Sequence, residues 1–161
     1  MPNQVFFSFI SIYKMSDLKP KKYYKGLSDK EAKEKKKNID KTKKLIKEGK
    51  DRKAFEIASK RPTTKQTRTS GFTARFKRDF PNVKPLTAEF AKKTGIPLKI
   101  QKEVFKRGKG AFATAGSRSS VKSPEQWAFA RLYAFYYKSL DGKLDFDKDL
   151  AKGLKFKKPL D

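Results

Sequence analysis

One segment of the 161-residue chain is apolar on nearly every side, and this feature limits the possible folds more than any other. It spans residues 127–137 and follows Ser123-Pro124-Glu125-Gln126, which has the pattern of a capping box with proline in the first helical turn. A helix with almost no polar face has to be covered by other elements. We therefore expect an all-α domain in which a helix beginning near residue 124 is the central one.

Two side chains of this segment carry further expectations. Arg131 is the one charged residue within the apolar stretch. A guanidinium in such surroundings needs a carboxylate or a carbonyl partner, so we expect Arg131 to have one. Trp127 stands at the start of the stretch, and we expect it to pack in the core rather than to serve as a stacking platform.

Residues 87–107 have the pattern of a helix-turn-helix pair. Thr87 can cap a first short helix, Gly95 can adopt the left-handed turn that ends it, and Pro97 can open the second helix. The second helix would direct three lysines outward, toward a DNA groove or its phosphates: Lys99, Lys102 and Lys106. Gln101 stands where a recognition helix usually buries an aliphatic residue. Plain scaffolding therefore remains the alternative interpretation of this pair.

Residues 23–66 are dominated by lysine and are predicted to form an extended, helical arm. Ser28 and Glu31 match a capping box, so a helix should begin there, and Gly49 is suited to end it. The few apolar residues give this helix only a thin apolar stripe. Either its charges contact a partner or it is an ordinary solvated helix, and both interpretations stay open.

Shorter helices are expected on both sides of a polar linker. One should occupy residues 51–60, before Arg61-Pro62 ends it. The stretch 63–71 is polar and without periodicity, which predicts the linker. Beyond it, three phenylalanines spaced four residues apart should share one helical face: Phe72, Phe76 and Phe80.

Residues 108–120 are rich in glycine, hydroxyl side chains and cations. This composition is typical of a turn-rich connector between helices, although its backbone N–H groups could instead cradle an anion. The glycine spacing does not match a Walker loop. With the three lysines of the helix-turn-helix pair, three cations in or beside this stretch complete the predicted polyanion-binding set: Arg107, Lys109 and Arg118.

The alternation of Asp145, Asp147 and Asp149 is similar to the start of a calcium-binding loop. Leu150 stands where such a loop requires glycine, and no glutamate closes the pattern, so we predict no metal site. Asp147 is instead predicted to cap a short helix that ends at Gly153.

The chain length suits one domain with tails. We divide it into an apolar N-terminal segment (1–22), the lysine-rich arm (23–66), a small helical domain (67–140) and a C-terminal tail (141–161). The first segment contains an apolar run of about nine residues, too short to span a bilayer. Four of its side chains are predicted to dock on a partner: Phe6, Phe7, Phe9 and Ile10. The alternative is that Met15 is the true start.

The charge balance narrows the classes of function. Lys and Arg number 42 against 17 Asp and Glu, which gives a formal net charge of +25. Such an excess opposes compaction unless a polyanion neutralises it. The absence of His and Cys removes imidazole bases, thiol nucleophiles, disulfides and most zinc sites. We therefore predict a protein that is not an enzyme, uses no cofactor or small-molecule substrate, and binds a negatively charged partner.

Five sequence blocks occur in order along the chain: Tyr24-Lys25-Gly26-Leu27-Ser28, Lys93-Thr94-Gly95-Ile96-Pro97, Arg107-Gly108-Lys109-Gly110-Ala111-Phe112, Gly116-Ser117-Arg118, and Trp127-Ala128 followed by Ala130-Arg131-Leu132. Together they resemble a small basic domain, without an established activity, of large DNA viruses of algae and amoebae and of some tailed phages. Members usually carry proline after Gly-Ser-Arg, where this chain has Ser119. The resemblance implies a virus-encoded protein, a component of the virion, and supplies no mechanism.

Two functions follow as hypotheses. The first is a minor structural protein of a large DNA virus particle that binds acidic capsid proteins, located in the virion and, during assembly, inside the host cell. The second is a virion protein that binds or condenses viral double-stranded DNA through the helix-turn-helix-like pair and the lysine arm. A nuclease comes third, because it would need clustered carboxylates for metal ions.

Overall fold

The computed structural model describes residue 18 and residues 20–65, 68–115 and 118–160. This part of the chain is helical and contains no strand, which confirms the all-α prediction. A short 3₁₀ helix, Lys21–Tyr23, precedes the α-helices. These are α1 (Asp29–Lys47), α2 (Asp51–Ala58), α3 (Gly71–Asp79), α4 (Ala88–Thr94), α5 (Leu98–Ala115), α6 (Pro124–Leu140) and α7 (Lys148–Ala151).

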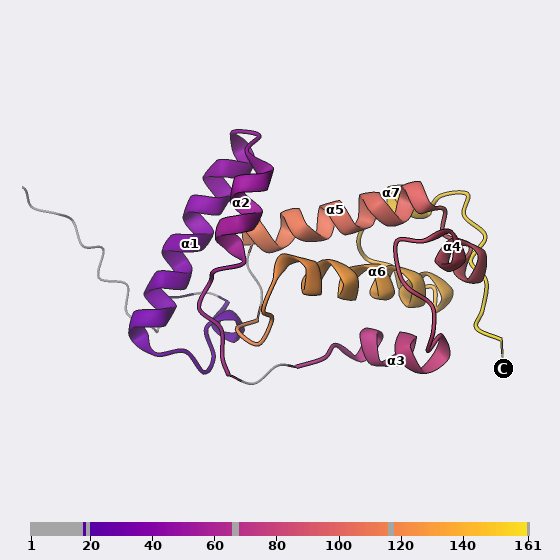
Figure 1. Ribbon diagram of the computed structural model, residues 1–161, viewed down its shortest axis with the longest axis horizontal. Coiled ribbons are helices and arrows are strands. Elements are labelled where there is room, and N and C mark those ends of the chain that lie inside the picture. Colours follow the sequence, from indigo (N-terminus) through magenta and orange to yellow (C-terminus); the bar gives the residue numbers. More distant parts are fainter. Residues whose placement is uncertain (1–17, 19, 66–67, 116–117, 161) are drawn as a thin grey trace, which may run out of the picture.

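The central helix is α6, as its apolar sequence predicts. In Figure 1 it runs between α5 on one side and α3 on the other. Ser123 caps it by accepting a hydrogen bond from the Gln126 backbone N–H at 3.1 Å, and Pro124 occupies the first turn. The Gln126 side chain accepts from the backbone N–H of Lys122 at 2.7 Å, one residue earlier than in a regular capping box.

Helices α5 and α6 cross where both carry small residues. A Cβ atom added to Gly108 would lie only 2.8 Å from the Cα atom of Ala128. Helix α5 continues through the glycine-rich stretch to Ala115, so the prediction of a turn-rich connector is wrong for residues 108–115. The alternative prediction of an anion cradle fails there as well, because helical N–H groups bond to carbonyls within the helix.

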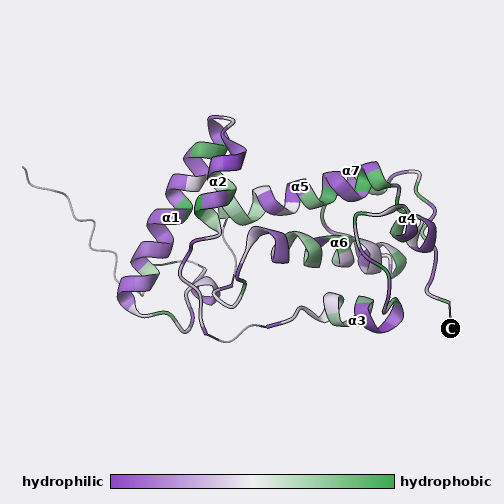
Figure 2. Cartoon of the chain, in the orientation of Figure 1, coloured by the Kyte–Doolittle hydropathy of each residue, from purple (hydrophilic) through white to green (hydrophobic). Residues whose placement is uncertain are grey.

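The lysine-rich arm forms a helical hairpin of α1 and α2, which stands at a steep angle to α5 and α6 (Figure 1). The predicted capping box of α1 is confirmed: the backbone N–H of Ser28 donates to the Glu31 carboxylate at 2.8 Å, and the Glu31 N–H donates to the Ser28 hydroxyl at 3.3 Å. Gly49 follows the helix with φ of 72°. Figure 2 shows α1 as mostly hydrophilic, whereas apolar segments recur along α5 and α6.

Arg61 attaches this hairpin to the end of α5. Its guanidinium is buried and donates to the backbone carbonyls of Phe112 and Ala113 at 2.6 and 2.9 Å. It also donates to the side chains of Asn38 and Thr42 in α1 at 2.6 and 2.8 Å. The last four carbonyls of an α-helix lack partners within the helix, so Arg61 supplies a positively charged C-terminal cap for α5.

The end of the molecule opposite the α1–α2 hairpin is stabilised by aromatic packing and by the C-terminal tail. Phe76 and Phe80 are buried and Phe72 is partly buried, and all three pack in or against one core cluster. The predicted helical face is confirmed for Phe72 and Phe76, whereas Phe80 lies just past the end of α3. The tail crosses α4, where the backbone N–H of Lys157 donates to the Thr94 carbonyl at 2.9 Å. The hydroxyl of Tyr136 in α6 donates to the Lys157 carbonyl at 2.6 Å. The tail therefore forms part of the folded body.

Arg131 has the partner that its apolar surroundings predict. The carboxylate of Asp147 accepts two hydrogen bonds from the Arg131 guanidinium at 3.0 and 3.1 Å. Asp147 precedes α7 as predicted, but its side chain makes no capping hydrogen bond. The capping role assigned to it is therefore wrong, because the nearly buried carboxylate is engaged by arginine instead. No described helix combines the length and the apolar character needed to cross a membrane.

Candidate polyanion-binding surface

Helix α1 carries a continuous stripe of lysines, which we call the α1 lysine stripe. The buried face of the helix is formed by Ala32, Lys35, Ile39 and Thr42. At 100° per residue, five lysines spaced three or four positions apart fall on the opposite face. All five are exposed: Lys30, Lys33, Lys37, Lys41 and Lys44.

This stripe is long, and its lysines form no ion pair with the described residues. From Lys30 to Lys44 it extends about 21 Å along the helix axis at 1.5 Å per residue. The ion pair within α1, between Lys36 and Asp40 at 2.5 Å, lies beside the stripe. Among the described residues, no carboxylate lies within 4.0 Å of any of the five stripe lysines. Their charges are therefore available to a partner.

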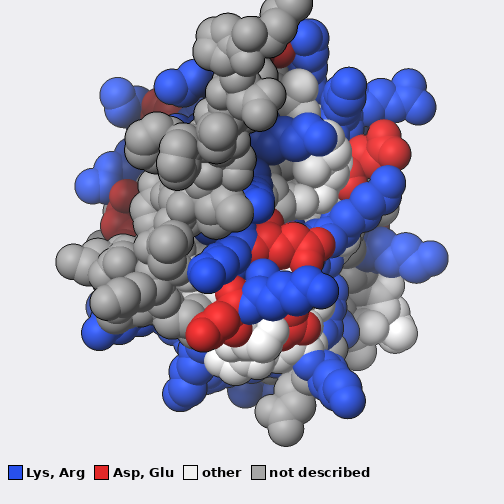
Figure 3. Space-filling model, turned by 90° about the vertical axis from the view of Figure 1, so that its left-hand side faces the viewer, with Lys and Arg blue, Asp and Glu red and all other residues white. Residues whose placement is uncertain are grey.

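The cationic surface continues around this end of the molecule. Figure 3 views the protein from the side of α1 and, in the part of this face that is coloured, shows many Lys and Arg side chains at the edge and a smaller patch of carboxylates near the centre. A surface of this kind can contact an extended polyanion from several directions.

The two helices and the turn predicted for residues 87–107 are present as α4 and α5. The Thr87 hydroxyl caps α4 by accepting from the Phe90 N–H at 3.1 Å, and Gly95 has a left-handed φ of 80°. Ile96 is fully buried in the corner. Gln101 is also buried, and its side-chain amide donates to the Ile96 carbonyl at 2.8 Å. A polar residue can therefore occupy the buried position of Gln101, because its side chain links α5 to the turn that precedes it.

Three of the six predicted polyanion-binding residues lie together on the outer side of α5. Lys99, Lys102 and Lys106 fall within about 60° of one another around the helix axis, and all three are exposed. No carboxylate in the described part of the chain lies within 4.0 Å of them. They form a second cationic patch, the α5 lysine patch.

The other three predicted residues lie elsewhere. Arg107 donates two hydrogen bonds to Asp149 at 2.9 and 2.8 Å and contacts Asp147 and Glu103 at 3.3 and 3.2 Å. The bonds to Asp149, and then those to Asp147 and Glu103, hold the pKa of Arg107 above its usual range. Its role in this structure is to join α7 to α5.

Lys109 and Arg118 are also separate from the α5 lysine patch. The ammonium of Lys109 lies 4.6 Å from the ring centroid of Phe55 and 3.8 Å from the Glu125 carboxylate. Arg118 is exposed and borders a groove beside α6. The predicted docking residues Phe6, Phe7, Phe9 and Ile10 lie outside the described part of the chain.

The aspartates of the C-terminal region are engaged by cations. Lys138 donates to Asp145 at 2.6 Å, while Asp147 and Asp149 bind arginines as described above. The structure, within the residues it describes, contains no group of three or more acidic, His or Cys side chains arranged to hold a metal ion.

Two buried cations were not identified from the sequence. Arg61 precedes a proline, so its sequence context indicates only the end of a helix, although its partners lie in α1 and α5. Lys35 is 2 % exposed, and its ammonium donates to the Tyr23 carbonyl. Burial, with a smaller contribution from the charge of Arg61, lowers the pKa of Lys35 to about 8. The available signal was its spacing of three and four residues from Ala32 and Ile39 on the apolar stripe.

Comparison with known proteins gives a family and no function. Neither a curated protein nor a solved structure matches the chain. A family model matches residues 20–151, which include every α-helix described above. On this evidence the chain belongs to the family of unknown function DUF5824.

Proposed function

We propose that this protein is a non-enzymatic component of a virus particle that binds the phosphate backbone of double-stranded DNA without reading its sequence. The observation that carries the proposal is the α1 lysine stripe, with five exposed lysines on one face of a capped helix that form no ion pair with the described residues. The viral setting comes from the resemblance of the sequence blocks, and the ligand class comes from the surface.

The spacing of the stripe suits a phosphodiester chain. Successive stripe lysines are separated by about 4.5 to 6 Å along the helix axis, at 1.5 Å per residue. Duplex DNA presents about one negative charge per 1.7 Å of its axis, so each lysine can meet a phosphate and release a condensed counterion. Because α1 is already folded and attached to α5, binding does not require the helix to form at that moment.

The outer side of α5 supports contact with phosphates rather than with bases. Its three exposed side chains are all lysines, which are flexible point charges. A lysine can contact guanine, but the Asn or Gln side chains that recognise adenine are missing from the exposed positions described in the first half of α5. Gln101 is the one side chain of the latter type in the first half of α5, and it is buried against the turn. We therefore expect affinity with little sequence preference.

Binding of a fluorescently labelled 30-base-pair duplex tests this proposal by anisotropy between 50 and 200 mM NaCl. If five stripe lysines each meet a phosphate, the affinity should fall by about 500-fold over this range, from a slope of about 0.9 per phosphate. Two duplexes of unrelated sequence should bind equally. Absence of duplex binding at 50 mM NaCl would remove the proposal.

A matched pair of variants tests the assignment to α1. The triple change Lys33→Gln, Lys37→Gln and Lys41→Gln should lower the salt slope by about 2.7, from about 0.9 per contact. The control removes the same charge from exposed positions outside both lysine surfaces: Lys84→Gln, Lys143→Gln and Lys152→Gln. Equal losses in both triple variants would show that total charge, and not the stripe, determines the affinity.

Attachment to acidic capsid protein is the second candidate function. It is supported by the spread of cations over more than the two lysine surfaces, which Figure 3 shows around the α1 end of the molecule. A protein positioned between a genome and its shell would use cations on several sides. Co-sedimentation with the acidic shell proteins of the particle, in the presence of excess duplex DNA, separates this function from DNA binding.

A further inference from the structure

A groove with an apolar floor runs along α6 on a surface that the DNA proposal does not use. It has a volume of about 840 Å³ and lies between α6 and the segment that leads into α3. Its floor and wall include Phe72, Trp127, Phe129, Ala130 and Ala134. The lining positions on α6 extend from residue 126 to residue 138, which is about 18 Å along the helix axis.

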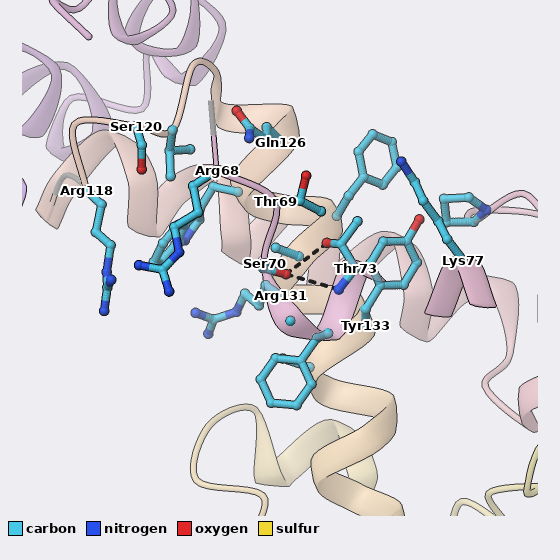
Figure 4. Close-up of a pocket in the computed structure, with 18 of the residues that line it drawn as sticks. Arg68, Thr69, Ser70, Thr73, Lys77, Arg118, Ser120, Gln126, Arg131 and Tyr133 are labelled. Carbon is cyan, nitrogen blue, oxygen red and sulfur yellow. Dashed lines mark hydrogen bonds between the residues drawn. The ribbon is translucent and has the colours of Figure 1, made fainter. Parts of the chain in front are cut away.

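The rim of this groove is cationic. Its basic residues are Arg68, Lys77, Arg118, Arg131 and Lys138, and no acidic residue is among the described residues that line it. Arg131 and Lys138 bind Asp147 and Asp145 within the fold, so Arg68 and Lys77 are the rim cations that we expect to pair with a partner's carboxylates. Figure 4 shows the side chains of three of the arginines extending to the same side of the groove. Helix α3 also begins at this rim, with Ser70 as its cap, so its N-terminal partial positive charge adds to theirs.

We infer that this groove binds a segment of a partner protein that combines acidic side chains with bulky apolar ones. The apolar floor would receive the apolar side chains, and the cationic rim would pair with the carboxylates. A length of about 18 Å accommodates about 12 residues of helix or about five of extended chain. This combination of an apolar groove and charge complementarity is typical of peptide recognition.

The floor is less suited to nucleic acid. Single-stranded nucleic acid binds to such surfaces by stacking its bases on free aromatic faces. Here the rings of Phe129 and Tyr133 already pack on rings of α5 and α3, with centroids 4.8 and 4.5 Å apart. The guanidinium of Arg131 lies over Phe146, 4.7 Å from the centroid of its ring. Rings whose faces are already covered offer little area for bases to stack on, so apolar side chains suit this floor better.

The groove and the DNA surface are separate. Figure 1 places α3, which forms one wall of the groove, on the opposite side of α6 from α5. None of the lysines of the α1 lysine stripe or the α5 lysine patch lines the groove. The inference therefore stands independently of the DNA proposal, and a protein with both surfaces could join a genome to a protein shell.

The single tryptophan of the chain provides a local test, because Trp127 lines the groove. The full chain would be titrated with a tryptophan-free 14-residue peptide that has Asp and Glu on one helical face and Leu on the other. We expect a saturable change in tryptophan emission. A peptide with Asn and Gln in place of the acidic residues should bind at least tenfold more weakly.

Two charge reversals locate the site. Arg68→Glu, an exposed change at the rim, should weaken binding of the acidic peptide by about tenfold. Arg52→Glu makes the same change of charge at an exposed position of α2 and should alter the affinity by less than twofold. The affinity of both variants for duplex DNA should stay within a few-fold of that of the unaltered chain. Loss of peptide binding can therefore be distinguished from loss of DNA binding.

Four results would overturn the inference. The first is an emission that stays unchanged at a large excess of the peptide, and the second is equal weakening of peptide binding by Arg68→Glu and Arg52→Glu. The third is that a 12-nucleotide single strand produces the same emission change as the peptide at a lower concentration than the peptide requires. The fourth is an emission change when the protein concentration alone is raised. The third would assign the groove to nucleic acid, and the fourth would assign it to a second copy of the chain.

Discussion

Gly108 and Gly110 stand two residues apart in α5, and only Gly108 faces another helix. A Cβ atom on Gly108 would meet the Cα atom of Ala128 at 2.8 Å, whereas nothing lies within 4 Å of one on Gly110. The two glycines are indistinguishable by composition, since both belong to the same short run. Their different roles follow from the side of the helix on which each lies.

This difference gives the first prediction. Gly108→Ala should lower the free energy of unfolding by about 1 to 3 kcal/mol, because the new methyl group would push α5 away from α6. Gly110→Ala should leave it unchanged or raise it by up to about 1 kcal/mol through helix propensity. Urea unfolding of both variants measures the two values. Equal destabilisation would show that the crossing is looser than described.

Lys35 gives a pH-dependent prediction. Its pKa is lowered to about 8 in the folded protein by burial, against 10.5 for an unperturbed lysine. Between these values the unfolded chain binds more protons than the folded one, so the stability contributed at this site rises with pH. In Lys35→Met this rise is absent. As the pH increases between about 8 and 10.5, the free energy of unfolding of the variant minus that of the unaltered chain should therefore decrease, by at most about 1.4 kcal/mol per pH unit.

Urea unfolding at pH 7, 8, 9 and 10 measures this difference. The tyrosines whose pKa values are raised by burial are present in both proteins, so their effect largely cancels. Lys33→Met, at an exposed position of the same helix, is the control and should show no such trend. A constant difference between Lys35→Met and the unaltered chain would contradict the burial of a charged ammonium at this site.

At the level of the helices, the contact between the α1–α2 hairpin and the end of α5 determines where the α1 lysine stripe lies. Arg61 and Thr42 both donate to the Ala113 carbonyl, which lies in the last turn of α5. The hairpin thus caps α5, while α5 provides the surface on which α1 packs. Each element satisfies groups that the other leaves unpaired.

Arg61→Lys tests this interdependence. An ammonium cannot reproduce the four hydrogen bonds of the guanidinium, so we expect a loss of about 2 to 4 kcal/mol in the free energy of unfolding. Hydrogen exchange should accelerate in α1 and α2 before it does in α6, because the hairpin would open locally. Arg52→Lys, exposed in α2, is the matched control and should have almost no effect. Unchanged exchange in α1 would show that Arg61 does not hold the hairpin.

For the whole molecule, the dominant property is a formal net charge of +25 on 161 residues. Repulsion among like charges opposes the compact state, and salt screens it with a Debye length of about 10 Å at 0.1 M. The ion pairs within the fold hold the C-terminal tail and α7 in place, but they do not remove the excess. Stability should therefore depend on ionic strength.

We expect the thermal midpoint to rise between 20 and 300 mM NaCl, and to rise further with inorganic polyphosphate, which binds the folded state. The two triple lysine-to-glutamine variants described above should both show a weaker dependence on NaCl, and to the same extent, because repulsion depends on total charge. Calorimetry measures these midpoints. A midpoint that is independent of salt would contradict the role of repulsion in limiting stability.

The sequence predicted those parts of the fold that depend on neighbours within about four residues. The caps at Ser28, Thr87 and Ser123 and the left-handed turn at Gly95 are present as predicted. The outward direction of Lys99, Lys102 and Lys106 followed from helical periodicity in the same way. The α1 lysine stripe could have been predicted too, since it is the complement of the thin apolar stripe.

The tertiary structure alone decided the contacts between residues far apart in the chain. The glycine-rich run is part of α5, where Gly108 lets α5 and α6 meet closely at Ala128, and Asp147 binds two arginines instead of capping α7. Arg61 caps a helix whose last turn begins 51 positions away. Helical periodicity and capping are fixed by local geometry, whereas burial, ion pairing and the groove on α6 depend on which helices meet, which the local sequence does not specify.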